Sequence, residues 1–170
     1  MSSEGTRVRW ERPDDLHAIR FVNEAAFGRS EEADLIDRLR VDRMVLASLV
    51  AEGEGRVVGH ILFSRMWVET AGRSISSVAL APLAVLPDHQ RRGIGGELVR
   101  FGLESLRACG EHMVFVVGHP GYYPRFGFSS DRASVFSSPF PPDAFMALEL
   151  SPGVLDGVRG TVRYPEAFGL

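Results

Sequence analysis

The segment from Gln90 to Gly96 reads QRRGIGG and combines two cations with three glycines at the start of an apolar, helix-like run. Adjacent arginines bring positive charge, and their planar guanidinium groups match phosphate oxygens. Glycines lack a Cβ atom, so a ligand can approach the backbone closely. The first amides of a helix have no intrahelical partners and carry the positive end of the helix dipole. The segment therefore predicts a site for a polyanion.

Two common phosphate-binding motifs do not fit this segment. A P-loop requires a lysine, and the sequence contains none. A dinucleotide fingerprint requires G-x-G-x-x-G early in a parallel unit, whereas Gly93, Gly95 and Gly96 are spaced differently and follow a long antiparallel region. The alternative without a ligand is a helix that begins at a glycine-rich turn with solvated arginines.

Length and composition narrow the class of protein. We expect the 170 residues to form one domain, with residues 1–5 flexible. A net charge of -3 argues against a general nucleic-acid binder. No apolar run reaches the roughly 18 residues that span a bilayer, and the first residues do not form a signal peptide. With Cys109 as the single cysteine, an internal disulfide is excluded, and we expect a cytoplasmic protein.

Apolar periodicity predicts the elements before the glycine-rich segment. Thr6–Trp10 alternates like a strand, and Leu16–Phe27 has helical spacing. Ser30, followed by acids, predicts an N-cap that opens a second short helix. Three longer runs joined by tight turns predict an antiparallel meander: Met44–Glu52, Arg56–Thr70 and Ser74–Leu86.

The later chain predicts a crossover and further strands. Ile94–Ala108 has a wide apolar face that suits a helix packed on a sheet, and the apolar run His112–Gly118 suits a central strand. This strand and the one before the helix should be parallel neighbours. The late segments PFPPDAFMALEL and GVRGTVRYPEAF look like strands between turns. We expect an α+β fold in α/β/α layers, with a mixed, mostly antiparallel sheet flanked by helices.

The segment LAVLPDHQRRGIGGELV resembles the cofactor motif of the GNAT superfamily of N-acetyltransferases. Its signature Q/R-x-x-G-x-G/A corresponds to Gln90–Gly95 and follows a Leu-x-Val strand end, Leu83–Val85. Downstream, Tyr123–Phe128 resembles a second family motif, Y-x-x-x-G-F. Together with APLAVLP and TVRYPEAF, these segments resemble the YhbS-like bacterial branch, and the resemblance covers nearly the whole chain.

The resemblance implies acetyl-CoA as co-substrate and no metal. The pyrophosphate would lie on the amides near Gly93, and the pantetheine arm along the strand that ends at Val85. Pro82 inside that strand predicts a bulge that splays the fourth strand from the fifth, although it could mark only a sheet edge. The residues expected to bind the co-substrate are Leu83, Ala84, Val85, Gln90, Arg91, Arg92, Gly93, Ile94, Gly95, Gly96, Tyr123 and Phe126.

The implied chemistry is direct attack of an amine on the thioester. The amine must first lose a proton, because an ammonium of pKa about 10 is not a nucleophile. A backbone N–H near Leu83 or Ala84 would stabilise the oxyanion. The leaving thiolate benefits from a proton, and the family gives that role to the motif tyrosine, Tyr123 here. The alternative is that Tyr123 only packs beside Tyr122 and Phe126.

The general base is open at this stage, because the strand Ser74–Leu86 contains no acid and no histidine. Glu24 on the first helix and His119 near the tyrosine motif are candidates. His60 and Glu69 are further candidates, although His60 lies among apolar residues and suits a buried strand position. A water chain to a carboxylate is a further alternative.

The acceptor is expected to be a primary amine of a small molecule or a protein. Four phenylalanines near the late prolines indicate either an aromatic acceptor wall or ordinary packing: Phe136, Phe140, Phe145 and Phe168. The alternative function is a non-catalytic acyl-CoA-binding or sensing module on the same fold, and a third possibility is a nucleotide-phosphate binder. We expect no nucleic-acid or membrane partner, and a monomer or homodimer.

Overall fold

The computed structural model describes residues 5–170. Of the segment 1–5, for which we expected flexibility, residues 1–4 lie outside the described part. Its helices are α1 (Leu16–Phe27), α2 (Glu31–Val41), α3 (Ile94–Ala108) and the short α4 (Ser130–Ala133). Its strands are β1 (Thr6–Trp10), β2 (Val45–Gly53), β3 (Arg56–Glu69), β4 (Ser74–Val85), β5 (Met113–Val117), β6 (Phe136–Ser137), β7 (Phe145–Glu149) and β8 (Gly160–Arg163).

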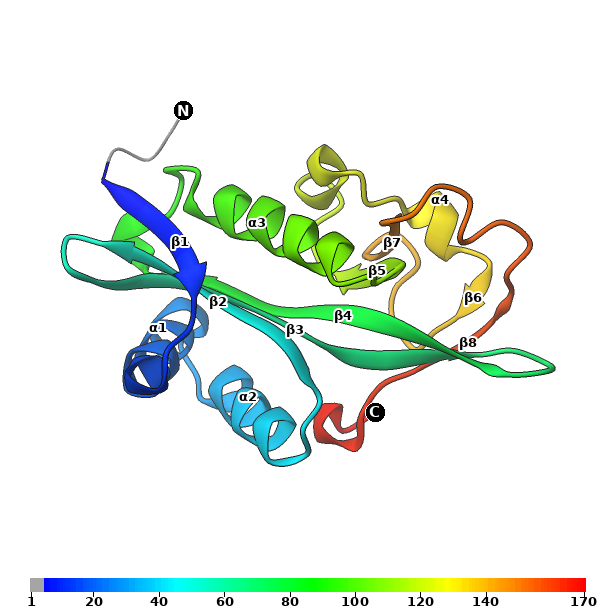
Figure 1. The fold of residues 1–170 in the computed structure, drawn as a ribbon, viewed down its shortest axis with the longest axis horizontal. Coiled ribbons are helices and arrows are strands. Elements are labelled where there is room, and N and C mark those ends of the chain that lie inside the picture. The colour runs from blue at the N-terminus through cyan, green and yellow to red at the C-terminus, as the bar shows by residue number, and fades with distance from the viewer. Residues whose placement is uncertain (1–4) are drawn as a thin grey trace.

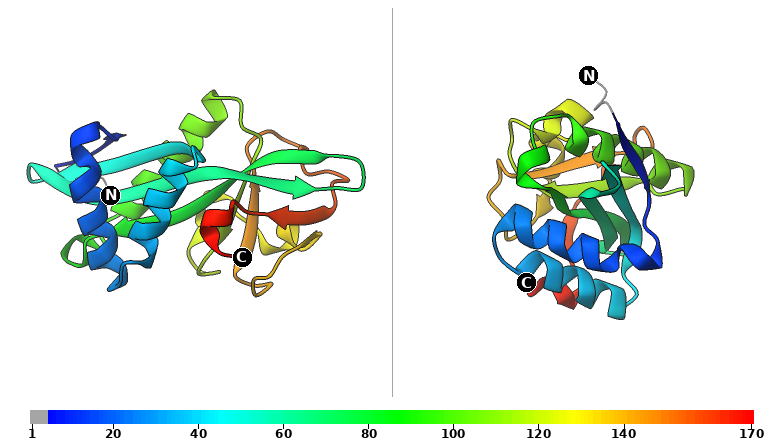
Figure 2. Two further views of the ribbon diagram at one scale, coloured as in Figure 1. Left: turned by 90° about the horizontal axis from the view of Figure 1, so that it is seen from below. Right: turned by 90° about the vertical axis from the view of Figure 1, so that its left-hand side faces the viewer.

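The strands form one mixed sheet between two layers of helix. Its order is β1-β2-β3-β4-β5-β7, and β8 joins β3 and β6 at one end. Pairing is antiparallel except between β4 and β5 and between β6 and β8. Helix α3 covers one face, while α1 and α2 cover the other (Figures 1 and 2). The expected fold, including the parallel crossover through α3, is confirmed.

The splay between the fourth and fifth strands is also confirmed, and its origin is a bulge at Pro82. Ile61 pairs with Leu83 but Phe63 pairs with Leu80, so Ala81 and Pro82 together oppose one residue of β3. Parallel pairing joins β4 to β5 only over Val78–Leu80 and Val114–Val116. After the bulge, β4 continues along β3 and no other described strand pairs with it. A gap therefore opens beside 83–85.

Two glycines let α3 lie very close to β3. A Cβ atom on Gly59 would lie 3.1 Å from side-chain carbons of both Ile94 and Leu98. A Cβ atom on Gly102 would overlap the ring of Phe63, which is fully buried. The hydrophobic core between α3 and the sheet thus fixes the position of the first turn of α3.

The Ser30 side chain does not act as the N-cap that the sequence predicted. Its backbone is helical, with φ -93° and ψ -12°, rather than extended as a capping residue requires. Its hydroxyl donates a hydrogen bond to Asp34 Oδ2 at 3.1 Å instead of accepting one from a helix amide. The helix still begins at Glu31, with acids in its first turn. Within residues 5–170, no helix is both long and apolar enough to cross a membrane.

Candidate active site

The glycine-rich segment forms a tight turn onto the first residues of α3. Arg91 and Gly93 adopt left-handed conformations, with φ of 64° and 84°. Gln90 ties the turn to the end of β4, since its Nε2 donates to the carbonyl of Val85 at 3.0 Å. A Cβ atom on Gly95 would lie 2.9 Å from the hydroxyl of Tyr122, so this helix start leaves no space for a side chain there.

A cavity of about 760 Å³ lies over this turn. It is cationic, because three arginines and one acid line it among the described residues: Arg91, Arg100, Arg125 and Glu97. Nine of the residues predicted to bind the co-substrate line it: Leu83, Val85, Gln90, Arg91, Gly93, Ile94, Gly95, Gly96 and Phe126. The cavity therefore combines three features: the backbone amides of the first turn of α3, glycines without a Cβ atom, and positively charged side chains.

Three predicted residues do not line this cavity. Ala84 is buried and Arg92 is exposed, and both lie outside the lining. Tyr123 lines the neighbouring cavity described below. Side chains alternate along a strand, so the neighbours Leu83 and Val85 face the cavity while Ala84 faces the core.

Several lining residues were not identified from the sequence. Arg100 lies four residues after Gly96 on α3, a spacing that places both on one helix face and could have indicated it. Its guanidinium carbon lies 5.1 Å from the Phe126 ring centroid, and that of Arg125 lies 4.5 Å from the Tyr122 centroid. His89 is buried at the cavity, and its Nδ1 has no hydrogen-bond partner among residues 5–170.

A second cavity, of about 490 Å³, lies at the splay between β4 and β5. Leu83 lines both cavities, so they meet at the residue that follows the bulge. The second cavity is lined by Phe27, Arg29, Glu32, Leu35, Ala79, Leu80, Ala81, Pro82, Leu83, Phe115, Val116, Val117, Tyr123, Phe140, Tyr164 and Phe168. Its wall is mainly apolar and aromatic, in contrast to the first cavity.

Tyr123 is held firmly at this second cavity. Its side chain packs where a Cβ atom on Gly118 would overlap the ring, and the residue is only 9% exposed. Burial, together with neighbouring Tyr122, raises the pKa of the Tyr123 phenol well above its ordinary value. The hydroxyl therefore keeps its proton at neutral pH and can act as a donor.

The structure does not bring Glu24 or His119 to either cavity. The Glu24 side chain is 42% exposed and pairs at 2.8 Å with Arg20, which also pairs with Asp34 and Asp37 of α2. His119 is exposed and lines neither of the two cavities. Glu69 is bound to Arg163 and Ser74 on the hairpin between β3 and β4. The carboxylate at the second cavity is instead Glu32, which sequence reasoning treated only as an acid in the first turn of a helix.

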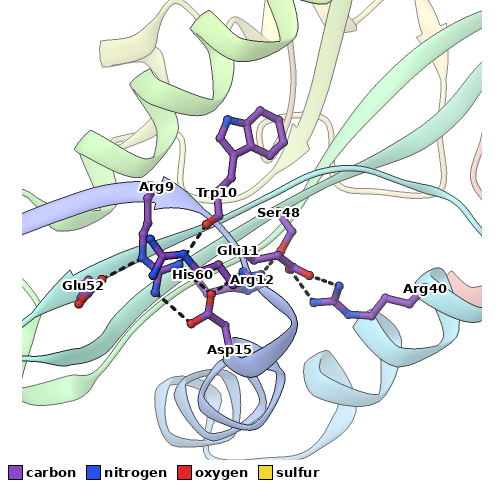
Figure 3. Close-up of polar contacts among 9 residues, drawn as sticks. All are labelled: Arg9, Trp10, Glu11, Arg12, Asp15, Arg40, Ser48, Glu52 and His60. Atoms are coloured by element: carbon purple, nitrogen blue, oxygen red, sulfur yellow. Dashed lines mark hydrogen bonds and ion pairs between the residues drawn. The ribbon is translucent and has the colours of Figure 1, made fainter.

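His60 is a satisfied core residue. It is fully buried, its Nε2 lies 2.8 Å from the Ser48 hydroxyl, and its Nδ1 lies 3.1 Å from the Asn23 amide. Burial, together with the charge of Arg40, lowers the pKa of His60 to about 3. Figure 3 shows His60, on β3, close to Ser48 and to the ion pair that Arg40 of α2 forms with Glu11. Among residues 5–170, no three His, Cys, Asp or Glu side chains are grouped to hold a metal ion.

The sequence profile described as an acetyltransferase (GNAT) domain matches residues 7–130. The chain therefore belongs to the GNAT acetyltransferase family, and the resemblance inferred from the motifs is confirmed.

Among its relatives is the uncharacterized N-acetyltransferase YjhQ of Escherichia coli K12, which is 45% identical over 132 residues, or 75% of this chain and 72% of the relative. A crystal structure of the E. coli N-acetyltransferase YhbS in complex with CoA has a TM-score of 0.89 and 32% identity, covering 98% of this chain and 93% of that one. A GNAT acetyltransferase from Brucella melitensis in complex with acetyl-CoA has a TM-score of 0.80 and 38% identity, covering 96% and 97% of the two chains.

Proposed function

We propose that this protein transfers an acetyl group from acetyl-CoA to a primary amine of a small molecule or protein, in the cytoplasm. The observation that carries the proposal is the meeting of two unlike cavities at Leu83. One is lined by arginines and a glycine-rich helix start, and the other contains Tyr123. The complexes of YhbS with CoA and of the Brucella enzyme with acetyl-CoA support the same assignment.

The first cavity fits the phosphates of acetyl-CoA. Free amides from Arg91 to Gly96 would bind the pyrophosphate, and Arg91, Arg100 and Arg125 would neutralise its charge. At 83–85, the edge of β4 that faces away from β3 pairs with no described strand, so its backbone groups can bond the pantetheine arm as an added strand would. The thioester would then lie near Leu83, at the entrance to the second cavity.

The reaction would be a direct transfer within a ternary complex. The amine releases a proton to a base or water, its nitrogen bonds to the acetyl carbon, and the carbon–sulfur bond breaks. The backbone N–H of Leu83 or Ala84 would stabilise the oxyanion, and Tyr123 would give its proton to the leaving thiolate. The Tyr123 hydroxyl supports this role by its place at the second cavity and by keeping its proton at neutral pH, although its raised pKa makes it a weaker acid than an ordinary phenol.

Thermal unfolding with acetyl-CoA, CoA and ATP is the first test. A ligand at 100 times its dissociation constant adds about 2.7 kcal/mol of stability. We expect a clear rise in Tm with acetyl-CoA and CoA but not with ATP. No rise at millimolar acetyl-CoA would overturn the assignment of the first cavity, and the transferase with it.

The second candidate is a non-catalytic acyl-CoA-binding or sensing module. The observation in its favour is that β4, Ser74–Val85, contains no acid and no histidine to act as a base. Tight acetyl-CoA binding without CoA release from any of a broad panel of amines would favour this module. Release of CoA that depends on an amine and on Tyr123 would exclude it.

A further inference from the structure

The second cavity has an aromatic wall built from three separate late segments. Phe140 precedes β7, Tyr164 follows β8, and Phe168 lies in a C-terminal 3-10 turn, Glu166–Phe168, beside α2 (Figure 1). The Phe140 and Tyr164 ring centroids are 5.5 Å apart at an interplanar angle of 83°, and those of Tyr164 and Phe168 are 5.1 Å apart at 60°. These rings form a continuous, edge-to-face surface.

The four late phenylalanines noted in the sequence therefore divide into two pairs. Phe136 and Phe145 are buried and pack on Phe115 in a core cluster. Phe140 and Phe168 are only partly buried and line the cavity. Burial raises the pKa of Tyr164 far above neutral pH, so its phenol adds no charge to this wall.

A single ion pair faces this apolar wall. Among the described residues that line the cavity, Glu32 is the one carboxylate and Arg29 the one cation. The Glu32 side chain is 14% exposed, whereas that of Arg29 is 60% exposed. Arg29 Nε donates to Oε1 at 2.9 Å and Nη2 to Oε2 at 2.6 Å, which holds the pKa of Glu32 below its ordinary value. Arg29 Nε also lies 3.2 Å from Oε2, so Arg29 makes three contacts to the carboxylate. Glu32 is an anion at neutral pH and has acceptor capacity beyond these contacts.

We propose that this cavity binds the acceptor, and that the acceptor is a small arylalkyl amine whose ring packs on Phe140, Tyr164 and Phe168 and whose ammonium is bound by Glu32. The inference rests on the proposed function, because it names the substrate class of that reaction. It also identifies Glu32 as a specificity-determining residue that the motifs do not contain.

The features of the cavity favour this class over other amines. Aromatic rings pack well edge to face on an aromatic wall, and an ammonium gains from nearby ring faces and a carboxylate. A polyamine carries several cations and would require several carboxylates, whereas one lines the cavity. The volume of about 490 Å³ lies within the range of sites for small molecules.

The substrate class is tested by release of CoA at saturating acetyl-CoA with four acceptors: 2-phenylethylamine, hexylamine, spermidine and a lysine-containing peptide. We expect kcat/KM for 2-phenylethylamine to exceed that of each of the other three by about 10-fold or more. A preference for any of the other three would overturn the proposal.

The role of Glu32 is tested by Glu32→Gln, with Glu31→Gln as the matched control. Glu31 is the exposed neighbour on the same helix and does not line the cavity. We expect Glu32→Gln to raise the KM for 2-phenylethylamine about 10-fold while leaving the KM for acetyl-CoA unchanged. Inhibition by the uncharged analogue 2-phenylethanol should be the same in both variants, because it needs no carboxylate. If Glu32→Gln weakens 2-phenylethanol and 2-phenylethylamine equally, Glu32 maintains the shape of the cavity and does not bind the ammonium.

Calorimetric binding of 2-phenylethylamine to the protein saturated with CoA separates this inference from the proposed function. Phe140→Leu should weaken this binding at least 5-fold, whereas the control Phe21→Leu, at an exposed position on α1, should not. This result would support the cavity assignment even if no acetyl transfer occurs. Absence of binding in a protein that acetylates another amine would overturn the inference and leave the transferase intact.

Discussion

Tyr122 and Tyr123 are neighbours in the chain, and their rings stand edge to face with centroids 5.0 Å apart, yet they line different cavities. Tyr122 lies over Gly95 beside the arginines, whereas Tyr123 faces the apolar cavity at the splay. One dipeptide therefore joins the site proposed to hold phosphates to the site proposed for chemistry. Substitutions at these two positions should separate co-substrate binding from turnover.

Replacing Tyr123 with phenylalanine should lower kcat at least 10-fold and leave the dissociation constant of acetyl-CoA nearly unchanged. The reason is that the change removes the proton given to the thiolate while preserving the ring. Steady-state kinetics and calorimetry measure the two quantities. Tyr122→Phe is the control, and its kcat should stay within about twofold of the unmodified protein. Full turnover in Tyr123→Phe would remove this residue from the mechanism.

Arg91→Gln should weaken CoA binding about 10-fold, the value of one charge-assisted hydrogen bond of roughly 1.5 kcal/mol. The adjacent Arg92→Gln should have a smaller effect, because Arg92 is exposed and does not line the cavity. Calorimetry at low and high salt should also show a weaker salt dependence for Arg91→Gln. Equal effects of the two substitutions would indicate a diffuse electrostatic attraction instead of a defined site.

Gly95→Ala should reduce the increase in Tm that CoA causes, measured for each protein against its own ligand-free Tm. Alanine favours a helix over glycine by about 1 kcal/mol, but its Cβ would lie 2.9 Å from the Tyr122 hydroxyl at the cavity. Gly72→Ala is a suitable control, because a Cβ atom there meets nothing within 4 Å. A full CoA-induced shift in Gly95→Ala would show that close backbone approach is not required.

His60 should make stability depend on pH in a defined window. Its pKa is about 3 in the folded protein, against an ordinary value of 6.5. The unfolded chain therefore binds a proton below pH 6.5 that the folded protein refuses, so the free energy of unfolding should fall by up to about 1.4 kcal/mol per pH unit between pH 6.5 and 4.5. Urea denaturation across this range should show the slope.

That slope should be largely absent in His60→Gln and retained in His17→Gln, which changes an exposed histidine on α1. Identical slopes in the two variants would assign the pH dependence to other groups.

Local sequence patterns predicted the elements that position the first cavity, which is lined by arginines. The bounds of α3, Ile94–Ala108, agree with the prediction because a glycine-rich start and a wide apolar face are both local signals. The bulge at Pro82 was predicted for a similar reason, since proline cannot donate a ladder hydrogen bond. The two-residue strand β6 was not predicted, because so short a segment carries no periodicity.

The second cavity depends on contacts that are distant in sequence. Glu32 lines it because α2 packs beside the C-terminal turn containing Phe168, more than a hundred positions later. Helical spacing alone could not show which face of α1 or α2 meets the gap beside β4. Glu24 was a reasonable candidate base for that reason, but its side chain pairs with Arg20 on the same helix and lines neither cavity.

Gly59 and Gly102 lie in the core between α3 and β3, yet they affect the position of the cavity at the start of α3. They let α3 lie so close to β3 that the first turn of the helix is fixed relative to the open edge of β4. A side chain at either position would push α3 away from β3, and the backbone amides at the start of α3 would move with it. In the proposed mode of binding, the thickness of the core therefore sets the distance between the phosphates at the start of α3 and the thioester beside Leu83.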